Sequence, residues 1–304
     1  MPELPEVETM RRGLQATVLG LRIESVTVLW RPSFDVAQAR IDALVSGHNI
    51  TAVRRRGKVL LLDLDDEQHV LVHPKMTGQL VVVKQGTTVF AGGHPSHSML
   101  GPMPNTTTRV VLALSTDTAL VFNDQRKFGW IRLVDTASLA REEFLSRLGP
   151  EPLSGAFTCR AFRERLAHHR GASIKAVILD QSTVAGVGNV YTDESLHLAR
   201  IDPRRRAGSL TTPEVARLHD AIVSVIGGAV EHGGTSFVDY VNDFRGSRTY
   251  LAQARVFGRE GQPCEACGTA IQRIRVAGRG TNICPHCQRY LAPRDRRDAV
   301  VPTR

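Results

Sequence analysis

The sequence predicts an α+β chain built from several parts, and three observations lead to this prediction. Apolar residues at helical spacing open the chain, a long stretch of short strands follows, and helical patterns return after residue 149. A short basic segment with four clustered cysteines comes last. With 304 residues, of which 42% are hydrophobic, the chain is long enough for two domains and a sizeable core.

The amino-terminal half is predicted to be a helix followed by a β-rich region. Residues 3–19 should form the helix, because apolar side chains recur on one side of it. These side chains are Leu4, Val7, Met10, Leu14 and Val18. From 21 to about 134, short strands broken by Gly, Asp and Asn predict a sandwich or a barrel. The predicted strands are 23–29, 58–64, 69–73, 80–84, 109–114 and 119–123.

The remaining parts follow from changes of pattern along the chain. Segment 85–108, rich in Gly, Thr, Pro, His and Ser, is predicted to be a mobile loop. Helices are expected at 158–169, 173–181, 190–198 and 212–231. We therefore divide the chain into four parts: 2–135, 136–249, 250–290 and 291–304. The last part is expected to be a disordered basic tail.

The charge of the chain points to a polyanionic partner. Its net charge is +9 and its pI about 9.8, a balance most often found in proteins that bind nucleic acid. No apolar run approaches the roughly 18 residues of a membrane span. The acidic, proline-rich start does not resemble a signal peptide. We expect a cytoplasmic protein that does not bind a membrane.

The cysteine cluster predicts a metal site. Cys264 and Cys267 form one Cys-x-x-Cys pair, and after sixteen residues Cys284 and Cys287 form another. Two such knuckles supply four thiolates to one tetrahedral, structural Zn²⁺, and no coordination position remains open for chemistry. Between the pairs, Arg279 lies on a glycine-flanked turn. Its guanidinium could reach a phosphate or a base edge, or could simply be solvated.

The first residues of the chain allow two interpretations. Proline and glutamate suit the first turn of a helix, and the motif alone favours this interpretation. If Met1 is removed, however, Pro2 carries a free secondary amine beside the Glu3 carboxylate. An amine can attack an electrophilic sugar carbon and form an imine. An α-amino group titrates near a pH of about 8, so it is more often neutral than a lysine.

Two glycine-containing turns carry further candidates. In the turn at 185–191, the backbone N–H groups and the Asn189 side chain could bind a phosphate. Asn189 could instead cap the next helix. A third possibility is that the turn only joins two helices. In the loop 124–130, Arg126 and Phe128 could enter a duplex, or the loop could be a β-turn with a core phenylalanine.

Two basic turns complete the set. The turn at 54–58 could deliver Lys58 to a phosphate or a leaving group, although such turns are commonly only solvated. The turn at 73–78 carries Met76, a flexible apolar side chain that could fill a gap in stacked bases.

Taken together, these motifs resemble the formamidopyrimidine-DNA glycosylases, bacterial enzymes that repair oxidised purines. Six elements match in the family's order: 2–9, 55–58, 126–129, 149–153, 186–191 and the four-cysteine finger. Leu4, Arg126 and Phe128 favour the purine-directed branch over the related endonuclease VIII branch. The resemblance implies a catalytic β-sandwich over 2–135, a helix–two-turns–helix DNA-binding domain over 136–249 and a zinc-finger β-hairpin over 250–290.

The resemblance also implies roles for single residues. Pro2 would be the nucleophile at C1′, Glu3 the acid that protonates the opening sugar, and Lys58 the base for β-elimination. Arg279 would bind phosphate and support δ-elimination. The implied DNA contacts, of which three fill the void left by a flipped base, are His73, Met76, Arg126, Phe128, Arg170 and Asn189. The implied partner is double-stranded DNA with oxidised bases, bound by a monomer at the bacterial nucleoid.

Several positions depart from the family pattern and keep alternatives open. The family usually reads His-Leu-Gly-Met where this chain has His73-Pro74-Lys75-Met76, and Lys-His where it has Thr106-Thr107. The stretch 238–248, where the family closes a loop over the base, also differs. One alternative is the same fold acting on oxidised pyrimidines. Another is a zinc-finger DNA-binding protein without catalysis.

Overall fold

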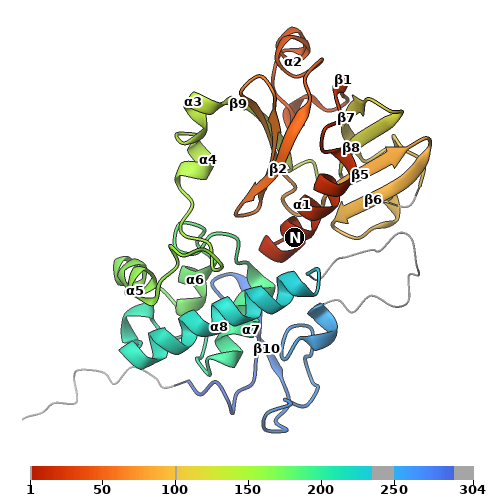
Figure 1. Ribbon diagram of the computed structural model, residues 1–304. Helices are drawn as coiled ribbons and strands as arrows, with labels where there is room; N and C mark the ends of the chain where they lie inside the picture. Colours follow the sequence, from red (N-terminus) through yellow and green to blue (C-terminus); the bar gives the residue numbers. More distant parts are fainter. Residues whose placement is uncertain (1, 100, 235–249, 291–304) are drawn as a thin grey trace, which may run out of the picture. The chain divides into compact units, whose positions relative to one another are not determined.

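The computed structural model describes residues 2–99, 101–234 and 250–290 (Figure 1). The chain divides into two compact units. Unit 1 comprises Met1–Glu151, Ala185–Val187 and Ile226–Gln253, and unit 2 comprises Pro152–Val184, Gly188–Val225 and Ala254–Arg304. The expected loop at 238–248 and the expected tail at 291–304 lie outside the described residues.

Unit 1 opens with the predicted helix, α1 (Leu4–Val18). The backbone N–H of Glu3 donates to Glu6 Oε2 at 2.8 Å, which satisfies a donor at the helix start. All five of its predicted core side chains are buried. Four of them, Val7, Met10, Leu14 and Val18, pack into a core shared with two β-sheets.

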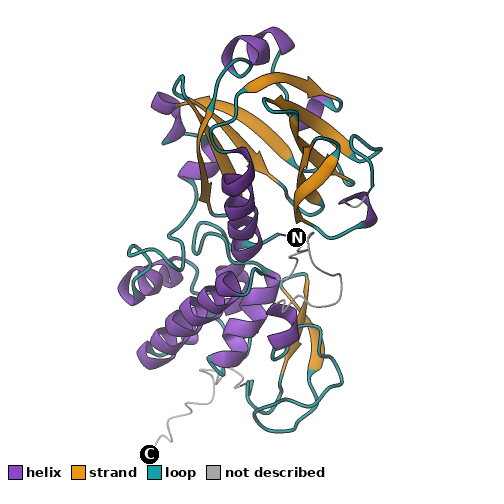
Figure 2. Ribbon diagram, turned by 45° about the vertical axis from the view of Figure 1, so that its right-hand side comes forward, coloured by secondary structure: helices purple, strands orange, loops and turns teal. Residues whose placement is uncertain are grey.

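The two sheets of unit 1 confirm the predicted sandwich (Figure 2). One sheet has five antiparallel strands in the order β1 (Ile23–Val28), β7 (Thr108–Leu114), β8 (Thr118–Asp124), β5 (Gly78–Lys84) and β6 (Thr87–Gly93). The other has four, in the order β2 (Ile50–Arg56), β3 (Val59–Leu64), β4 (Gln68–His73) and β9 (Trp130–Asp135). Alternate residues such as Leu60 and Leu62 face the shared core, as a period of two requires.

Short helical elements connect the strands, and two of them cover the outer face of the four-stranded sheet. Leu139 of α3 (Thr136–Leu139) and Phe144 and Leu145 of α4 (Glu143–Ser146) pack on Val59, Leu61 and Leu71 of the four-stranded sheet. The other short elements of unit 1 are η1 (Arg31–Ser33), α2 (Gln38–Leu44), η2 (His97–Met99) and η4 (Tyr250–Gln253).

The prediction of a mobile loop over 85–108 is wrong for much of that segment. Residues Thr87–Gly93 form β6, which pairs with β5. Met99 and Met103 then pack on the outer face of the five-stranded sheet, against Val81 and Val121. Gly92 is one of the glycines that suggested a loop. Packing against α1 explains the glycine, because an added Cβ there would lie 2.8 Å from Met10 Cγ.

Unit 2 contains helices and a small hairpin (Figure 2). Its helices match the predicted ones closely: α5 (Cys159–His168), α6 (Ile174–Leu179), α7 (Asn189–Leu198) and α8 (Thr212–Glu231), whose last turns belong to unit 1. Between α7 and α8 lies η3 (Ala207–Ser209), and the hairpin consists of β10 (Gln272–Val276) and β11 (Arg279–Ile283). The multidomain α+β class is therefore confirmed.

A buried ion pair fastens the hairpin to the helices of unit 2. Lys175 of α6 and Asp193 of α7 are fully buried, with Nζ 2.6 Å from Oδ1. Lys175 also donates to Thr281 Oγ1 at 2.7 Å, and the backbone N–H of Asn282 donates to Asp193 Oδ2 at 2.8 Å. Both charges are thus hydrogen-bonded as well as paired, as buried charges require.

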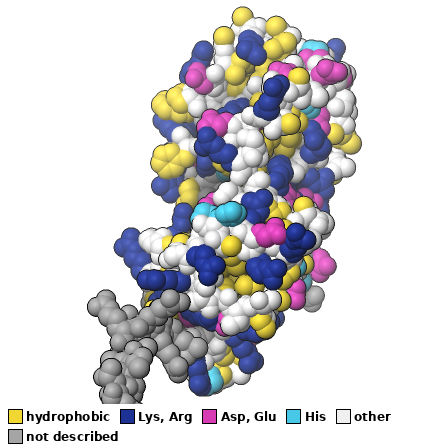
Figure 3. Space-filling model, turned by 90° about the vertical axis from the view of Figure 1, so that its left-hand side faces the viewer, with side chains coloured by type: hydrophobic (Ala, Val, Ile, Leu, Met, Phe, Trp, Pro, Cys, Tyr) yellow, Lys and Arg dark blue, Asp and Glu magenta, His cyan; other side chains and the backbone are white. Residues whose placement is uncertain are grey.

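The surface agrees with the basic composition. Lys and Arg side chains are spread over the face shown in Figure 3, with Asp and Glu side chains between them. Within the described residues, no helix combines the length and apolar character that a membrane span requires.

Candidate active site

The amino terminus is seated on the glycine turn of unit 1. Pro2 and Glu3 are buried, and the backbone N–H of Leu4 donates to Gly186 O at 2.9 Å. Gly186 has a φ of 90°, and an added Cβ would lie 2.7 Å from the Leu4 Cβ. Only glycine allows both the backbone angle and this close approach. The amino-terminal motif therefore starts a helix, as its composition suggests. The hydrogen bond to Gly186 and the close packing of Leu4 on this glycine hold the helix start in position.

Lys58 reaches the same turn. Its side chain is buried, and Nζ donates to Val187 O at 3.0 Å. Leu4 and Lys58 therefore bind the carbonyl groups of two consecutive residues. The structure thus brings the start of the chain, with its buried Pro2 and Glu3, and the Lys58 ammonium to one short turn.

Glu151 holds the turn that precedes Lys58, and the sequence analysis did not identify this residue. The Gly57 N–H donates to Glu151 Oε1 at 2.5 Å, and Arg55 forms two parallel hydrogen bonds to the same carboxylate at 3.0 Å each. Gly57, with a φ of 58°, makes the tight turn into β3. The motif at 149–153 is the local sequence feature that contains Glu151.

A second carboxylate supports Arg55 from α1. Glu8 Oε2 lies 3.3 Å from Arg55 Nε, and Arg11 also binds Glu8. Burial acts to raise the pKa of Glu8, but hydrogen bonds and charge from Arg11, Arg12 and Arg55 hold it below its usual value. Glu8 is thus ionised near neutral pH, and it links the helix to the turn that carries Lys58.

The His73 side chain is buried under the turn at 73–78. Only 4% of its surface is exposed, between the rings of Trp130 and Phe144. Burial, with the nearby charges of Lys75, Lys58 and Arg132, lowers the pKa of His73 to about 3. The neutral ring accepts the Lys75 N–H on Nδ1 at 3.0 Å. It therefore shapes the turn, and its DNA contact stays a prediction.

The wedge candidates lie on two exposed loops of unit 1. Phe128 is 56% exposed, which rules out the alternative that it is a core residue. The Arg126 guanidinium lies 4.9 Å from the Phe128 ring centroid, a cation–π contact that orients both side chains. Met76 is partly exposed on the turn at 73–78. All three side chains are thus available for contact with a ligand.

In unit 2, Asn189 does not cap α7. Gly188 occupies the N-cap position, and Asn189 Nδ2 donates instead to Gly280 O of the hairpin at 3.1 Å. Arg279 is exposed at the start of β11, after a two-residue turn in which Ala277 and Gly278 both have positive φ. A hollow of about 400 Å³ is lined by Asn189, Phe257, Gly258, Glu260, Arg273, Gly280 and Asn282. Arg170 is exposed in the turn that follows α5.

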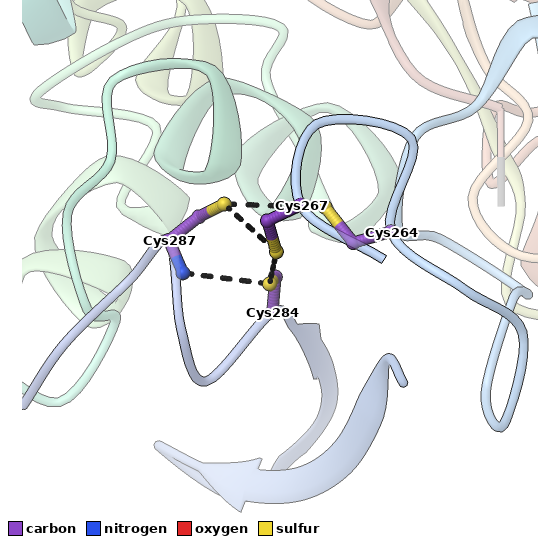
Figure 4. Close-up of side chains that lie close together, drawn as sticks. All are labelled: Cys264, Cys267, Cys284 and Cys287. Carbon is purple, nitrogen blue, oxygen red and sulfur yellow. Dashed lines mark hydrogen bonds between the residues drawn. The ribbon is translucent and has the colours of Figure 1, made fainter. Parts of the chain in front are cut away.

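The four cysteines form one metal site, as predicted (Figure 4). The Sγ atoms of Cys267 and Cys284 are 3.4 Å apart, those of Cys267 and Cys287 3.5 Å, and those of Cys264 and Cys287 4.0 Å. Tetrahedral zinc with Zn–S bonds of about 2.3 Å requires sulfur–sulfur distances of about 3.8 Å. The donors therefore fit one structural zinc ion, which would order a hairpin too small to fold alone.

Sequence reasoning also missed a neighbour of this metal site. The buried His197 of α7 has its Nε2 3.5 Å from Cys264 Sγ. A ring N–H near a thiolate is a usual outer partner of a zinc ligand. No local spacing pattern links His197 to the finger, because the two are joined only by folding.

Comparisons with known proteins agree with this geometry. The Formamidopyrimidine-DNA glycosylase N-terminal domain matches residues 1–131, and the H2TH domain of the same enzymes matches 148–240. A zinc finger found in FPG and IleRS matches 261–289. A formamidopyrimidine-DNA glycosylase from Herpetosiphon aurantiacus is 41% identical over 290 residues, covering 95% of this chain and 100% of the relative. The chain belongs to the formamidopyrimidine-DNA glycosylase family.

Solved structures of the family share the fold. The Lactococcus lactis enzyme in complex with DNA containing N7-benzyl-Fapy-dG matches with a TM-score of 0.82 and 31% identity. Its complex with DNA containing an oxidised pyrimidine matches with a TM-score of 0.81 and 31% identity. Each match covers 95% of this chain and 100% of the other. This chain is thus an enzyme of the DNA glycosylase and abasic-site lyase class, with a zinc finger.

Proposed function

We propose that this enzyme flips oxidised purines, such as 8-oxoguanine and formamidopyrimidines, out of double-stranded DNA and removes them through a covalent Pro2 imine. It then cleaves the strand by β,δ-elimination. The observation that carries the proposal is the convergence of the amino terminus and Lys58 on the carbonyls of Gly186 and Val187. A nucleophile that attacks a single sugar carbon must be held in a fixed position.

The first step requires a free Pro2 nitrogen, so Met1 must be removed. The neutral secondary amine attacks C1′, an N–C1′ bond forms, and the base leaves with the electron pair of the glycosidic bond and a proton. The Glu3 carboxyl group gives its proton to O4′ as the sugar ring opens, which leaves an iminium ion at C1′. Glu3 suits this role because it adjoins Pro2 in the chain and its side chain is buried.

The second step uses the acidity that the iminium ion confers on the C2′ proton. Removal of this proton breaks the C3′–O3′ bond, and a further elimination breaks the C5′–O5′ bond. Lys58 serves the β-elimination, as proton acceptor when neutral and as partner of the departing phosphate when charged. Arg279 and Asn189 bind phosphate groups, Arg279 during δ-elimination, and Arg170 contacts a further phosphate.

The target base is hidden inside a duplex and must be extruded before Pro2 can reach the sugar. We assign the filling of the resulting gap to Met76, Arg126 and Phe128, whose exposure suits this role. A wedge of this kind offsets part of an unstacking cost of about a few kcal/mol. We assign His73 a further DNA contact, and its ring also shapes the turn that carries Met76.

The partner and the place of action follow from this chemistry. Relatives solved with lesion-containing DNA support double-stranded DNA as substrate, and the net charge of +9 supports phosphate binding without sequence preference. We propose a monomer that acts at the bacterial nucleoid, where chromosomal lesions arise.

Borohydride trapping tests the mechanism. The enzyme is incubated with 8-oxoguanine DNA and borohydride, and the adduct is digested and analysed by mass spectrometry. We expect a covalent link at the Pro2 nitrogen in protein that lacks Met1, no adduct in protein that retains Met1, and a normal adduct with the matched control Pro5→Ala. An adduct located at another residue, or formed while Met1 is present, would refute the Pro2 mechanism. Salt-sensitive binding without any cleavage would indicate a DNA-binding protein instead.

A second candidate function is the removal of oxidised pyrimidines. The observation that favours it is the similarity to the Lactococcus lactis enzyme solved with DNA that contains an oxidised pyrimidine. A panel that compares excision rates for 8-oxoguanine and thymine glycol in the same duplex separates the two. Faster excision of thymine glycol would favour the second function.

A further inference from the structure

The two loops that carry the wedge candidates end at the same place in unit 1. Thr77 directly precedes β5, and Asp124 is the last residue of β8. The two strands pair antiparallel with Gly78 opposite Asp124. The turn that carries Met76 and the loop that carries Arg126 and Phe128 therefore meet at Asp124.

One carboxylate and one hydroxyl join the two loops. Asp124 is fully buried, and its Oδ1 accepts the hydroxyl proton of Thr77. The Arg126 N–H donates to Thr77 Oγ1 at 3.0 Å and to Asp124 Oδ1 at 3.2 Å. The Gly129 N–H donates to Asp124 Oδ2 at 2.6 Å. A hydroxyl from the first loop and two amides from the second are thus bound to one buried acid.

The surrounding packing leaves these loops little freedom. An added Cβ at Gly129 would lie 2.6 Å from the Phe122 ring, and one at Gly78 would lie 2.3 Å from Pro74 O. Each loop also holds a lysine at positive φ, Lys75 at 51° and Lys127 at 60°. Backbone angles of this kind are unfavourable for non-glycine residues and persist where the structure imposes them, often at functional sites.

We propose that Thr77 and Asp124 are positioning residues that hold both loops in one arrangement, so that Met76, Arg126 and Phe128 enter the duplex together. The inference rests on the proposed wedge function of these three side chains. Loops that are already ordered lose little conformational entropy on insertion, whereas independent loops each lose more. The hydroxyl–carboxylate link therefore favours extrusion of the base without touching the reacting atoms.

This role predicts a split between two reactions of the same enzyme. Excision of 8-oxoguanine requires extrusion of a stacked base, and so depends on the wedge. An abasic site has no base to extrude, and its cleavage depends mainly on Pro2, Glu3 and Lys58. Loss of the link should therefore slow base excision much more than cleavage at a ready-made abasic site.

The test is the single-turnover rate of both reactions in Thr77→Val, which keeps the size of the side chain and removes the hydroxyl. Hydrogen bonds to charged groups have energies that correspond to roughly tenfold to a hundredfold in rate. We expect a loss of that order in 8-oxoguanine excision and a change of less than about threefold at the abasic site. Thr77→Ser, which keeps the hydroxyl, should restore most of the excision rate. Thr51→Val, which removes an exposed hydroxyl elsewhere in unit 1, serves as control.

Several outcomes would overturn the inference. Normal excision by Thr77→Val would mean that the link is unimportant. Equal loss of both reactions, with a lower melting temperature, would mean that the link only stabilises the fold. Failure of Thr77→Ser to restore excision would exclude the hydroxyl as the cause. Asp124→Asn is the second variant, and it should show the same split, because the neutral amide cannot accept all three hydrogen bonds.

A double variant, Arg126→Ala with Phe128→Ala, separates this inference from the proposed function. If that variant excises 8-oxoguanine normally, the wedge function itself is wrong. If it loses excision while Thr77→Val does not, the wedge function stands and only the link between the loops is refuted.

Discussion

His73 should make the stability of this protein depend on pH. Its ring is buried and neutral in the folded state, because burial and nearby positive charges lower its pKa from 6.5 to about 3. In the unfolded chain the ring is in water and regains its usual pKa. The unfolded state therefore binds the proton more tightly, and acid favours unfolding.

The sign and the size of the effect follow from these two values. The contribution of His73 is fully present above the unfolded value of 6.5 and is lost as the pH falls from 6.5 towards 3. At about pH 5, the ring of the unfolded chain is protonated and that of the folded chain is not. The difference of about 1.5 pH units then amounts to roughly 2 kcal/mol of the free energy of unfolding.

The assay compares urea unfolding of the wild type and His73→Asn at about pH 7.5 and pH 5. Asparagine does not titrate, and its Oδ1 can take over the hydrogen bond from the Lys75 N–H. The wild type should lose roughly 2 kcal/mol more than the variant between the two pH values. Replacement of the exposed His168 by asparagine should leave the wild-type pH dependence unchanged. Equal pH dependence in the wild type and His73→Asn would refute the reasoning.

Three further predictions concern the supports of the site. Lys175→Met leaves the buried Asp193 carboxyl group without its ion-pair partner, so it should lower the free energy of unfolding by about 3–5 kcal/mol. Adding Asp193→Asn should recover part of this loss, and strictly additive effects would contradict the coupling. Glu151→Gln should weaken the hydrogen bonds that hold the turn before Lys58. We expect abasic-site cleavage, measured in single turnover, to slow about tenfold. The control Glu143→Gln, which changes an exposed ion pair, should leave this rate unchanged. Removal of zinc by a chelator should unfold the hairpin and weaken DNA binding. One equivalent of Zn²⁺ should restore DNA binding in a titration. DNA binding that is unaffected by metal loss would contradict a structural role for the zinc ion.

Local patterns in the sequence were enough to predict several elements. The apolar spacing of α1, the alternation in the strands and the two Cys-x-x-Cys pairs all depend on neighbours within a few residues. The helices of unit 2 also matched their predicted ranges closely. In each of these cases, the residues that determine the structure lie close together along the chain.

Other features could not be predicted in this way. The glycines of β6 suggested a loop, but they allow the strand to pack against Met10 of α1. No local pattern showed that His73 is buried, because the rings that cover it come from Trp130 and Phe144, more than 50 residues further along the chain. Glu151 supports Lys58 from a position 93 residues further along the chain, so no local pattern could relate the two.

The sequence by itself determined the family, the zinc ligands and the candidate chemistry of the amino terminus, because each depends on residue types at short, fixed spacings. Only the tertiary structure decided which of these residues meet. Leu4 and Lys58 reach adjacent carbonyls of a turn that follows them by more than 120 residues. Thr77 and Asp124 are joined across paired strands. Such contacts form only when burial of the core brings distant segments together, and this is why the arrangement of the site had to come from the fold.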